Sequence, residues 1–209
     1  HQTMPPESYM YAIPRELYEE HGIRKYGFHG TSHKFITEAA AAYLGAPSSE
    51  LKLITCHLGN GASVAAVRHG KVVDTSMGMT PLSGLVMGTR SGDIDPGIVF
   101  YLKRKGLNSR DIDNVLNKQS GLLGAGGVGS GDMRDIISAL ENGTETAQIA
   151  FDLWIHRLVF YIGGYYALLS GADAVVLTGG IGENSQPARA ALVSRLGAIG
   201  CRLDRSANM

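Results

Sequence analysis

Thr178-Gly-Gly-Ile-Gly-Glu-Asn184 stands directly behind the apolar run Ala172-Asp-Ala-Val-Val-Leu177. A short run with adjacent valines predicts a buried strand, and the glycines that follow let backbone approach a bound ligand because no Cβ stands in the way. Pro187 favours the first turn of a helix soon afterwards, so the glycines occupy a strand-to-helix turn. Turns of this kind direct backbone N–H groups towards anions and leave flat surface for a ring.

A second glycine turn, His57-Leu-Gly-Asn-Gly61, follows another apolar run, Leu51-Lys-Leu-Ile-Thr55. Taken alone, it is either a tight turn with a polar histidine at its rim or a cradle for phosphate oxygens. It is not a Walker A loop, because no Gly-Lys-Ser/Thr follows, and it is not a GxGxxG dinucleotide fingerprint. Two glycine turns behind two strands indicate a nucleotide held between two loops.

The composition fits one globular domain, with or without a small subdomain, in a chain of 209 residues. Nineteen basic and nineteen acidic residues cancel, which gives no electrostatic case for nucleic acid or an anionic membrane as a partner. No apolar run approaches the ~20 residues that span a bilayer, and the N-terminus carries no signal pattern. Cys56 and Cys201 lie far apart and favour a reducing compartment, so we expect a cytoplasmic protein.

Hydrophobic periodicity predicts two helices with a core-facing side. A helix capped by Thr31 or Ser32 runs to about residue 44, with an apolar stripe of Phe35, Ala39, Ala42 and Tyr43. A long helix over 144–170 has a broad apolar face, and its Gly163-Gly164 pair either bends it or admits a close neighbour. That face consists of Ile149, Leu153, Trp154, Leu158, Tyr161, Ile162 and Tyr165.

Turn residues divide the rest of the chain into short elements. His69-Gly70 predicts a two-residue hairpin turn, and the glycine-rich stretch 121–131 predicts a flexible loop. Strands are expected at 51–56, 63–68, 71–75 and 172–177, and further helices at 15–21, 96–105, 108–118, 132–142 and 187–196.

Tyr26-Gly-Phe-His-Gly-Thr-Ser-His33 places two histidines four residues apart at a helix start. His29 lies between glycines and is a candidate for catalysis or phosphate contact, with a metal ligand or a structural histidine as the alternatives. His33 is expected to be a packed or surface residue of the helix.

Arg90 lies among small residues in Met87-Gly-Thr-Arg-Ser-Gly-Asp-Ile-Asp-Pro96, and nothing beside it in the sequence would bury its stem. It is either a solvated surface arginine or a group that binds a carboxylate or phosphate, for which its planar fork is suited. Asp93 and Asp95 either steady it or cap the helix that begins at Pro96.

Together these segments resemble the acetate kinase family, within the actin/Hsp70/sugar-kinase superfamily of phosphotransferases. Six matching segments run in family order along essentially the whole chain: His1-Gln-Thr-Met-Pro5, Tyr26-Gly-Phe-His-Gly-Thr-Ser-His33, His57-Leu-Gly-Asn-Gly61, Asp74-Thr-Ser-Met-Gly78, Gly88-Thr-Arg-Ser-Gly-Asp-Ile-Asp-Pro96 and Gly179-Gly-Ile-Gly-Glu-Asn184.

The resemblance implies an α/β fold of the actin-like ATPase (ribonuclease H-like) class, with a mixed sheet flanked by helices. It implies reversible phosphorylation of acetate by ATP to acetyl phosphate, through in-line phosphoryl transfer. His29 and Arg90 match the family's transition-state stabilising pair, and Phe28 and Pro81 match positions that line the pocket for the acetate methyl. The implied ATP contacts are His57, Leu58, Gly59, Asn60 and Gly61, then Asp132, Met133 and Arg134, then Gly180, Ile181, Gly182, Glu183 and Asn184.

The resemblance covers mainly one lobe, so we expect residues 1–209 to be the C-terminal nucleotide-binding lobe of a two-lobe kinase. The chain opens at His1 without an initiator methionine, and the family's N-terminal lobe and catalytic aspartate would precede it. Mg²⁺ ligands are expected outside this chain, the isolated chain is expected to be inactive, and the family implies a homodimer. The alternatives are a propionate or butyrate kinase, or a non-catalytic nucleotide-binding dimerisation module.

Overall fold

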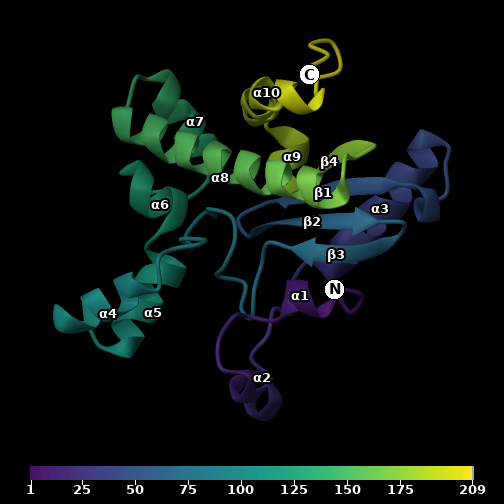
Figure 1. Ribbon diagram of the computed structural model, residues 1–209. Helices are drawn as coiled ribbons and strands as arrows, with labels where there is room; N and C mark the ends of the chain where they lie inside the picture. Colours follow the sequence, from purple (N-terminus) through teal and green to yellow (C-terminus); the bar gives the residue numbers. More distant parts are fainter. Residues whose placement is uncertain (209) are drawn as a thin grey trace.

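The computed structural model describes residues 1–208 as a mixed four-stranded sheet flanked by helices (Figure 1). The strands lie in the order β3-β2-β1-β4. Neighbours β3, β2 and β1 pair antiparallel, whereas β4 pairs parallel to β1. The strands are β1 (Lys52–Leu58), β2 (Ala62–Arg68), β3 (Lys71–Thr75) and β4 (Ala174–Thr178). An α/β fold with a mixed sheet was expected, and this is confirmed.

The hairpin between β2 and β3 turns at His69-Gly70, as the sequence predicts. Both residues have positive φ, 53° and 75°, which is the backbone of a two-residue turn that matches the twist of a hairpin. Strand β4 was predicted to be buried, and this is wrong, because all five of its residues are half-exposed. It lies at the edge of the sheet, where one side has no neighbouring strand among the described residues.

The two faces of the sheet differ in chemistry. On β1 and β2, the side chains of even-numbered residues such as Ile54 and Val64 join the main hydrophobic core. Helix α8 (Glu145–Leu169) covers that face and contributes Trp154, Leu158 and Ile162 to the core. Odd-numbered residues point to the opposite face, which α3 (Gly30–Leu44) covers with a smaller apolar cluster and several buried polar side chains.

Helix α3 differs from its prediction in two respects. Its N-cap residue is His29, with φ of 58° and no side-chain cap, so neither Thr31 nor Ser32 caps it. Its buried residues are His33, Ile36, Thr37 and Ala41, and the predicted stripe is on the outside: Phe35, Ala39, Ala42 and Tyr43 are all exposed. The physical reason is that α3 covers a partly polar sheet face, so it turns polar residues inwards.

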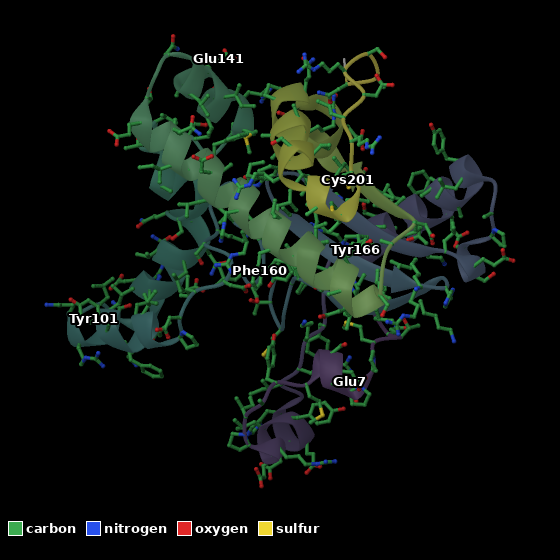
Figure 2. All side chains as sticks on the ribbon, turned by 45° about the horizontal axis from the view of Figure 1, so that its top comes forward. Glu7, Tyr101, Glu141, Phe160, Tyr166 and Cys201 are labelled. Carbon is green, nitrogen blue, oxygen red and sulfur yellow. The ribbon has the colours of Figure 1, made fainter. Side chains whose placement is uncertain are left out.

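Helix α8 buries most of its predicted apolar face, but not all of it. Trp154, Leu158, Ile162 and Tyr165 are buried, whereas Ile149 and Leu153 are exposed. The exposed pair continues along the helix into Phe160 and Leu168, which gives α8 an outer apolar stripe. Figure 2 labels Phe160 on this helix. A Cβ on Gly163 or Gly164 would meet nothing within 4 Å, so this stripe has open space at its centre.

The stretch 121–131 is not simply a flexible loop, because its first half forms α6 (Gly121–Gly126). Leu122 is buried, and a Cβ on Gly126 would lie 2.7 Å from Ile136, so glycine here permits close helix packing. The remaining elements are α1 (Pro6–Tyr9), α2 (Arg15–His21), η1 (Ser48–Glu50), α4 (Gly97–Arg104), α5 (Ser109–Lys118), α7 (Met133–Glu141), α9 (Gly179–Asn184), α10 (Gln186–Arg195) and η2 (Gly197–Ile199).

The predicted helices near α2, α4, α5, α7 and α10 are confirmed within a few residues. Asn108 is the N-cap of α5 and forms a capping box with Asp111. The glycine turn at 179–184 is itself a short helix rather than an open loop. Within residues 1–208, no helix is both long and apolar enough to cross a bilayer.

Candidate nucleotide-binding and catalytic site

His29 lies where the chain enters α3, with its backbone in the left-handed region. A residue with a Cβ rarely takes this conformation, and such strain concentrates at functional sites. Its Nδ1 is 2.9 Å from Ser63 Oγ, and its ring stacks on His57 at 4.2 Å between centroids. Burial, with the nearby His57 and Arg90, lowers the pKa of His29 to about 4, so the ring is neutral at pH 7.

Arg90 is half-buried in the segment that precedes α4. Its Nη1 donates a 2.9 Å hydrogen bond to the Pro81 carbonyl, so its guanidinium is held at a fixed place rather than free in solvent. Asp93 does not contact it. The Asp93 carboxylate accepts hydrogen bonds from the Ser83 hydroxyl and from Tyr161 on α8, and so anchors the segment that carries Arg90.

Asp95 accepts a 2.8 Å hydrogen bond from the Gly97 N–H at the start of α4. Of the two roles that the sequence left open for this residue, the structure selects capping of the helix.

The glycine turn between β1 and β2 brings His29 and Arg90 together. A Cβ on Gly61 would lie 3.4 Å from Arg90 Nη2 and 3.6 Å from His29 Nε2. The two side chains therefore face one point in space, and that point is open only because residue 61 has no side chain. A guanidinium and an imidazole around an open point can hold a small anion.

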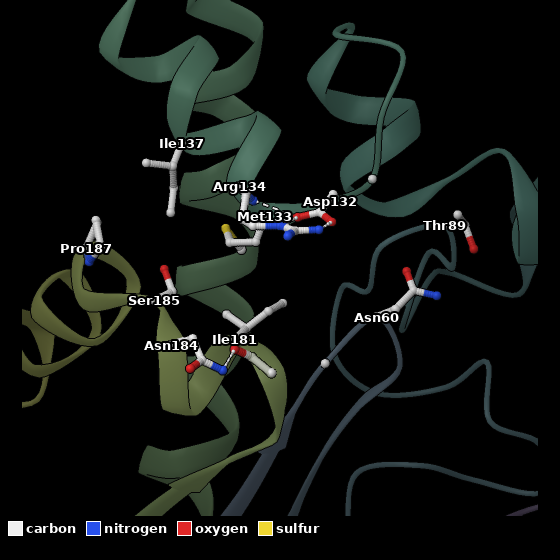
Figure 3. A pocket seen from close by; sticks show the side chains of 13 residues that line it. Asn60, Thr89, Asp132, Met133, Arg134, Ile137, Ile181, Asn184, Ser185 and Pro187 are labelled. Carbon is white, nitrogen blue, oxygen red and sulfur yellow. Dashed lines mark hydrogen bonds and ion pairs between the residues drawn. The ribbon is translucent and has the colours of Figure 1, made fainter.

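A cavity of about 750 Å³ lies next to this pair. Asn60 and Thr89, the neighbours of Gly61 and Arg90, form one wall of it. Figure 3 shows Ile137 and Met133 from α7 opposite Ile181 and Asn184 from α9. The volume is that of a small-molecule or nucleotide site, with apolar walls and a few polar groups. The full lining is Gly59, Asn60, Thr89, Gly131, Asp132, Met133, Arg134, Ile137, Gly180, Ile181, Asn184, Ser185 and Pro187.

Asp132 and Arg134 form a rigid pair at the mouth of the cavity. Asp132 caps α7 through the Arg134 N–H, and its carboxylate also accepts two hydrogen bonds from the Arg134 guanidinium, at 2.6 and 3.0 Å. These hydrogen bonds lower the pKa of Asp132 to about 2, so it is ionised at neutral pH. The Arg134 side chain is 89% exposed, so one face of its guanidinium is open to a ligand.

Several predicted nucleotide contacts do not line the cavity. Leu58 is buried in the core, and a Cβ on Gly182 would meet Leu177 and Leu58 rather than the cavity. The Glu183 carboxylate turns back to accept hydrogen bonds from Thr178 Oγ1 and the Gly179 N–H, which lower its pKa. His57 lies beside His29, and its Nδ1 is 2.9 Å from Ser32 Oγ.

Of the two predicted pocket residues, Pro81 touches Arg90 through its carbonyl and Phe28 packs against the main core.

Sequence reasoning missed Thr89, Ser63 and Thr55, and a signal existed for the last two. Each carries a hydroxyl between two apolar neighbours in its strand, and both side chains are fully buried. His33 is also buried, and it bridges them: its Nδ1 is 2.8 Å from Thr55 Oγ1 and its Nε2 is 2.8 Å from Ser63 Oγ. Of the two positions that the sequence left open for His33, packed or on the surface, the structure therefore selects the packed one.

The histidines do not form a metal centre in the described part of the chain. No group of three or more His, Cys, Asp or Glu side chains among residues 1–208 is arranged to bind a metal ion.

Comparison with known proteins identifies the chain's relatives. Its whole length, residues 1–209, matches the family model described as the Acetokinase family. It is 56% identical over 209 residues to the acetate kinase of Halothermothrix orenii and 54% identical to that of Methanosarcina thermophila. The match covers 100% of the chain but 52% and 51% of these proteins, so the chain spans about half the length of the curated relatives it matches.

Solved structures give the same picture. An acetate kinase from Porphyromonas gingivalis superposes with a TM-score of 0.95 at 44% identity, over 99% of this chain and 52% of that one. A propionate kinase from Francisella tularensis superposes with a TM-score of 0.94 at 47% identity, over 100% and 53%. These structures have the actin-like ATPase fold, which confirms the predicted fold class. The chain belongs to the acetokinase family.

Proposed function

We propose that residues 1–209 form the C-terminal, nucleotide-binding lobe of a two-lobe kinase that reversibly phosphorylates acetate with ATP. The observation that carries this proposal is that Asn60 and Thr89, which line the 750 Å³ cavity, are the chain neighbours of Gly61 and Arg90, at the point that His29 and Arg90 both face. A nucleotide in the cavity would extend its phosphates past Asn60 to that point. The acetate kinases among the relatives support acetate as the acceptor.

Phosphoryl transfer spreads negative charge over the moving oxygens, so the protein acts mainly by positioning and by cationic stabilisation. Arg90 supplies the positive charge, and its bond to Pro81 fixes the direction of its fork. His29 is neutral in the free site, and its Nε2 faces the point at which the phosphoryl group would lie. The strained backbone at His29 and the stacking on His57 hold the ring in place, which removes reorganisation cost during the reaction.

The pocket for the acceptor's alkyl group is formed in part by Phe28 and Pro81 in this proposal. Pro81 is in contact with Arg90 through its carbonyl, so a carboxylate on the Arg90 fork would place its alkyl end near this residue. The propionate kinase of Francisella tularensis is 47% identical to this chain, which supports propionate as a second candidate acceptor. One extra methylene is worth only ~1–3 kcal/mol of discrimination, so small changes in the pocket decide between the two.

Catalysis requires the second lobe in this proposal. In-line transfer needs nucleotide, acceptor and Mg²⁺ clamped in one geometry with water excluded, and we place the Mg²⁺ ligands outside this chain. The chain alone should bind ADP weakly and have no turnover.

Homodimerisation through α8 is supported by its outer stripe, where Phe160 is 64% exposed beside the open space at Gly163 and Gly164. A cytoplasmic location is supported by the two unpaired cysteines, Cys56 and Cys201.

The test is a coupled assay of ADP formation by the complete two-lobe protein, with acetate, propionate and butyrate side by side. Acetate should give the highest kcat/KM, and a higher value for propionate would select the second candidate. Calorimetry with ADP, size-exclusion chromatography and a turnover assay on the 209-residue chain test whether the active site is divided between two lobes. Acetyl phosphate formation by that chain alone would show that it is not. ADP binding and self-association without turnover by the complete protein would instead identify a non-catalytic dimerisation module.

A further inference from the structure

Four side chains form a continuous hydrogen-bonded chain from the sheet interior to the catalytic point. It runs from Thr55 to His33 to Ser63 to His29, with links of 2.8, 2.8 and 2.9 Å. The inner anchor of the chain is the Thr55 hydroxyl, which lies 3.4 Å from the Ala65 carbonyl, a long distance for an O–H···O hydrogen bond. Thr55 and Ser63 are fully buried and His33 is 1% exposed, so water does not compete along the chain.

The order of the protons follows from the outer end of the chain, where the Arg90 guanidinium faces Nε2 of His29 and favours a lone pair on that nitrogen. His29 then carries its proton on Nδ1 and donates it to the Ser63 oxygen. A buried, neutral imidazole has one N–H and one bare nitrogen, so in this order Ser63 donates to His33 Nε2 and His33 donates from Nδ1 to the Thr55 oxygen. The proton of Thr55 is then left for the Ala65 carbonyl.

This order of protons determines which nitrogen of His29 is protonated at the point above Gly61. With its proton on Nδ1, His29 turns a bare Nε2 towards the point above Gly61 and towards Arg90. The positive guanidinium of Arg90 across that point favours a lone pair on Nε2 of His29. A phosphoryl oxygen at the same point disfavours that lone pair, because the oxygen needs a hydrogen-bond donor and an unprotonated nitrogen is not one.

We propose that Thr55, His33 and Ser63 are positioning residues that keep the proton of His29 on Nδ1, so that His29 takes up a second proton at Nε2 when a phosphoryl group occupies the point above Gly61. This inference rests on the proposed function for the identity of the ligand. The balance is simple: one proton passes from water or buffer to Nε2, no proton leaves the chain, and the imidazolium then donates from both nitrogens, to Ser63 and to the phosphoryl oxygen.

The other titratable groups near His29 do not take up the proton in its place. His57 stacks on its ring and hydrogen-bonds to Ser32, and Arg90 lies across the point above Gly61. His33 lies behind Ser63, with His1 against its far side at 5.9 Å between ring centroids. These neighbours disfavour a charge on His29 in the free site, so the incoming phosphoryl charge is what drives proton uptake.

The test begins with long-range ¹H–¹⁵N spectra of the complete protein with ¹⁵N-labelled histidine, the His29 signals being assigned with His29→Asn. Without nucleotide, His29 should be the Nδ1–H tautomer. With ATP, both of its nitrogens should be protonated, and calorimetry in buffers of different ionisation enthalpy should record uptake of about one proton. ADP is the matched ligand, because it lacks the γ-phosphoryl group, and it should bind without this uptake.

Thr55→Val removes the anchor without touching the cleft and should abolish the preference for Nδ1–H. Its control is Thr75→Val, which removes another buried threonine hydroxyl that donates to a strand carbonyl, that of Val64, and should leave His29 unchanged. Ser63→Ala breaks the chain next to His29 and should have the same effect as Thr55→Val.

An Nε2–H tautomer in the free protein, or equal proton uptake with ATP and ADP, would overturn the proposal. The free-protein spectrum tests the order of protons even if no nucleotide binds, whereas failure to bind both nucleotides would instead refute the proposed function.

Discussion

Gly61→Ala should inactivate the complete enzyme without unfolding it. The new methyl would lie 3.4 Å from Arg90 Nη2, 3.5 Å from Nη1 and 3.6 Å from His29 Nε2. These are ordinary van der Waals contacts, so the free protein accommodates the methyl. A phosphoryl oxygen must come within about 2.7–3.1 Å of the same nitrogens, and the methyl fills the place from which it would do so.

The size of the effect follows from this displacement. Shifting a reacting group by about 1 Å costs ~10²-fold in rate, so kcat/KM should fall ~10²-fold or more, which is ~2.7 kcal/mol of transition-state stabilisation. Folding stability should change little or rise by ~0.4–1 kcal/mol, because alanine restricts the unfolded chain and the backbone here is not in the left-handed region.

The assay is coupled ADP formation, with urea unfolding of the same preparation. Gly197→Ala is the matched control, because its Cβ also has ordinary backbone geometry but meets nothing within 4 Å. It should keep normal turnover. Near-normal turnover by folded Gly61→Ala would refute the placement of the phosphoryl group at this point, and marked destabilisation would show that glycine is needed there for the fold.

Arg90→Ala should lower turnover ~10³-fold, with little rescue by Arg90→Lys, because a point charge cannot reproduce the fork; a lysine variant with near-normal kcat would show that Arg90 is a surface charge. His29→Asn should lower turnover ~10²- to 10³-fold while Tm stays close to wild type, since asparagine tolerates the left-handed backbone; loss of Tm with normal activity per folded molecule would make His29 structural. Gly180→Val should weaken ATP binding measured by calorimetry, because the new Cβ would stand in open space where residue 180 lines the cavity. Gly182→Val should lower Tm instead, because its Cβ would meet Leu177 and Leu58. The reverse pattern would place the nucleotide on the other side of α9. Burial lowers the pKa of His33 to about 3, so the unfolded chain binds a proton at this residue more tightly than the folded chain does. The free energy of unfolding, measured in urea, should therefore fall as the pH drops below about 6.5, by up to ~1.4 kcal/mol per pH unit. If His33→Gln leaves this pH profile unchanged, His33 is not its cause.

Local signals in the sequence predicted the elements well. His69-Gly70 and Asn108 determine a turn and a helix start by their own backbone and side-chain chemistry, and both are found as predicted. The family resemblance implied that His29 and Arg90 act as a pair, and the two side chains do face one point, although 61 positions separate them in the sequence. What the motifs do not contain is the role of Gly61, because the space that a missing side chain leaves is visible only in three dimensions.

The errors have a common cause in tertiary context. The apolar stripe of α3 was assigned to the core because residues such as Phe35 and Tyr43 recur at helical spacing, yet periodicity cannot tell that the covered sheet face is partly polar. The stretch that contains Gly126 was assigned to a loop because glycine is a poor helix former, yet close packing against Ile136 repays that cost. Gly182 was predicted to contact the nucleotide, and this stays a prediction for its backbone, because a Cβ there would face Leu58 and Leu177.

Because side chains alternate along β1 and β2, the two faces of the sheet have different roles. Even-numbered positions such as Ile54 and Val64 supply the packing under α8, and odd-numbered positions such as Thr55, His57 and Ser63 face α3 and the reacting groups. A saturation mutagenesis scan of these strands should therefore show a period of two in the kind of damage. Substitutions at even positions should lower the amount of protein that a cell accumulates, and those at Thr55, His57 and Ser63 should lower activity more than abundance. The apolar odd positions Leu53 and Val67, which lie in the smaller cluster under α3, should behave like the even ones. Natural drift in stability and in chemistry can then proceed on the same strands almost independently.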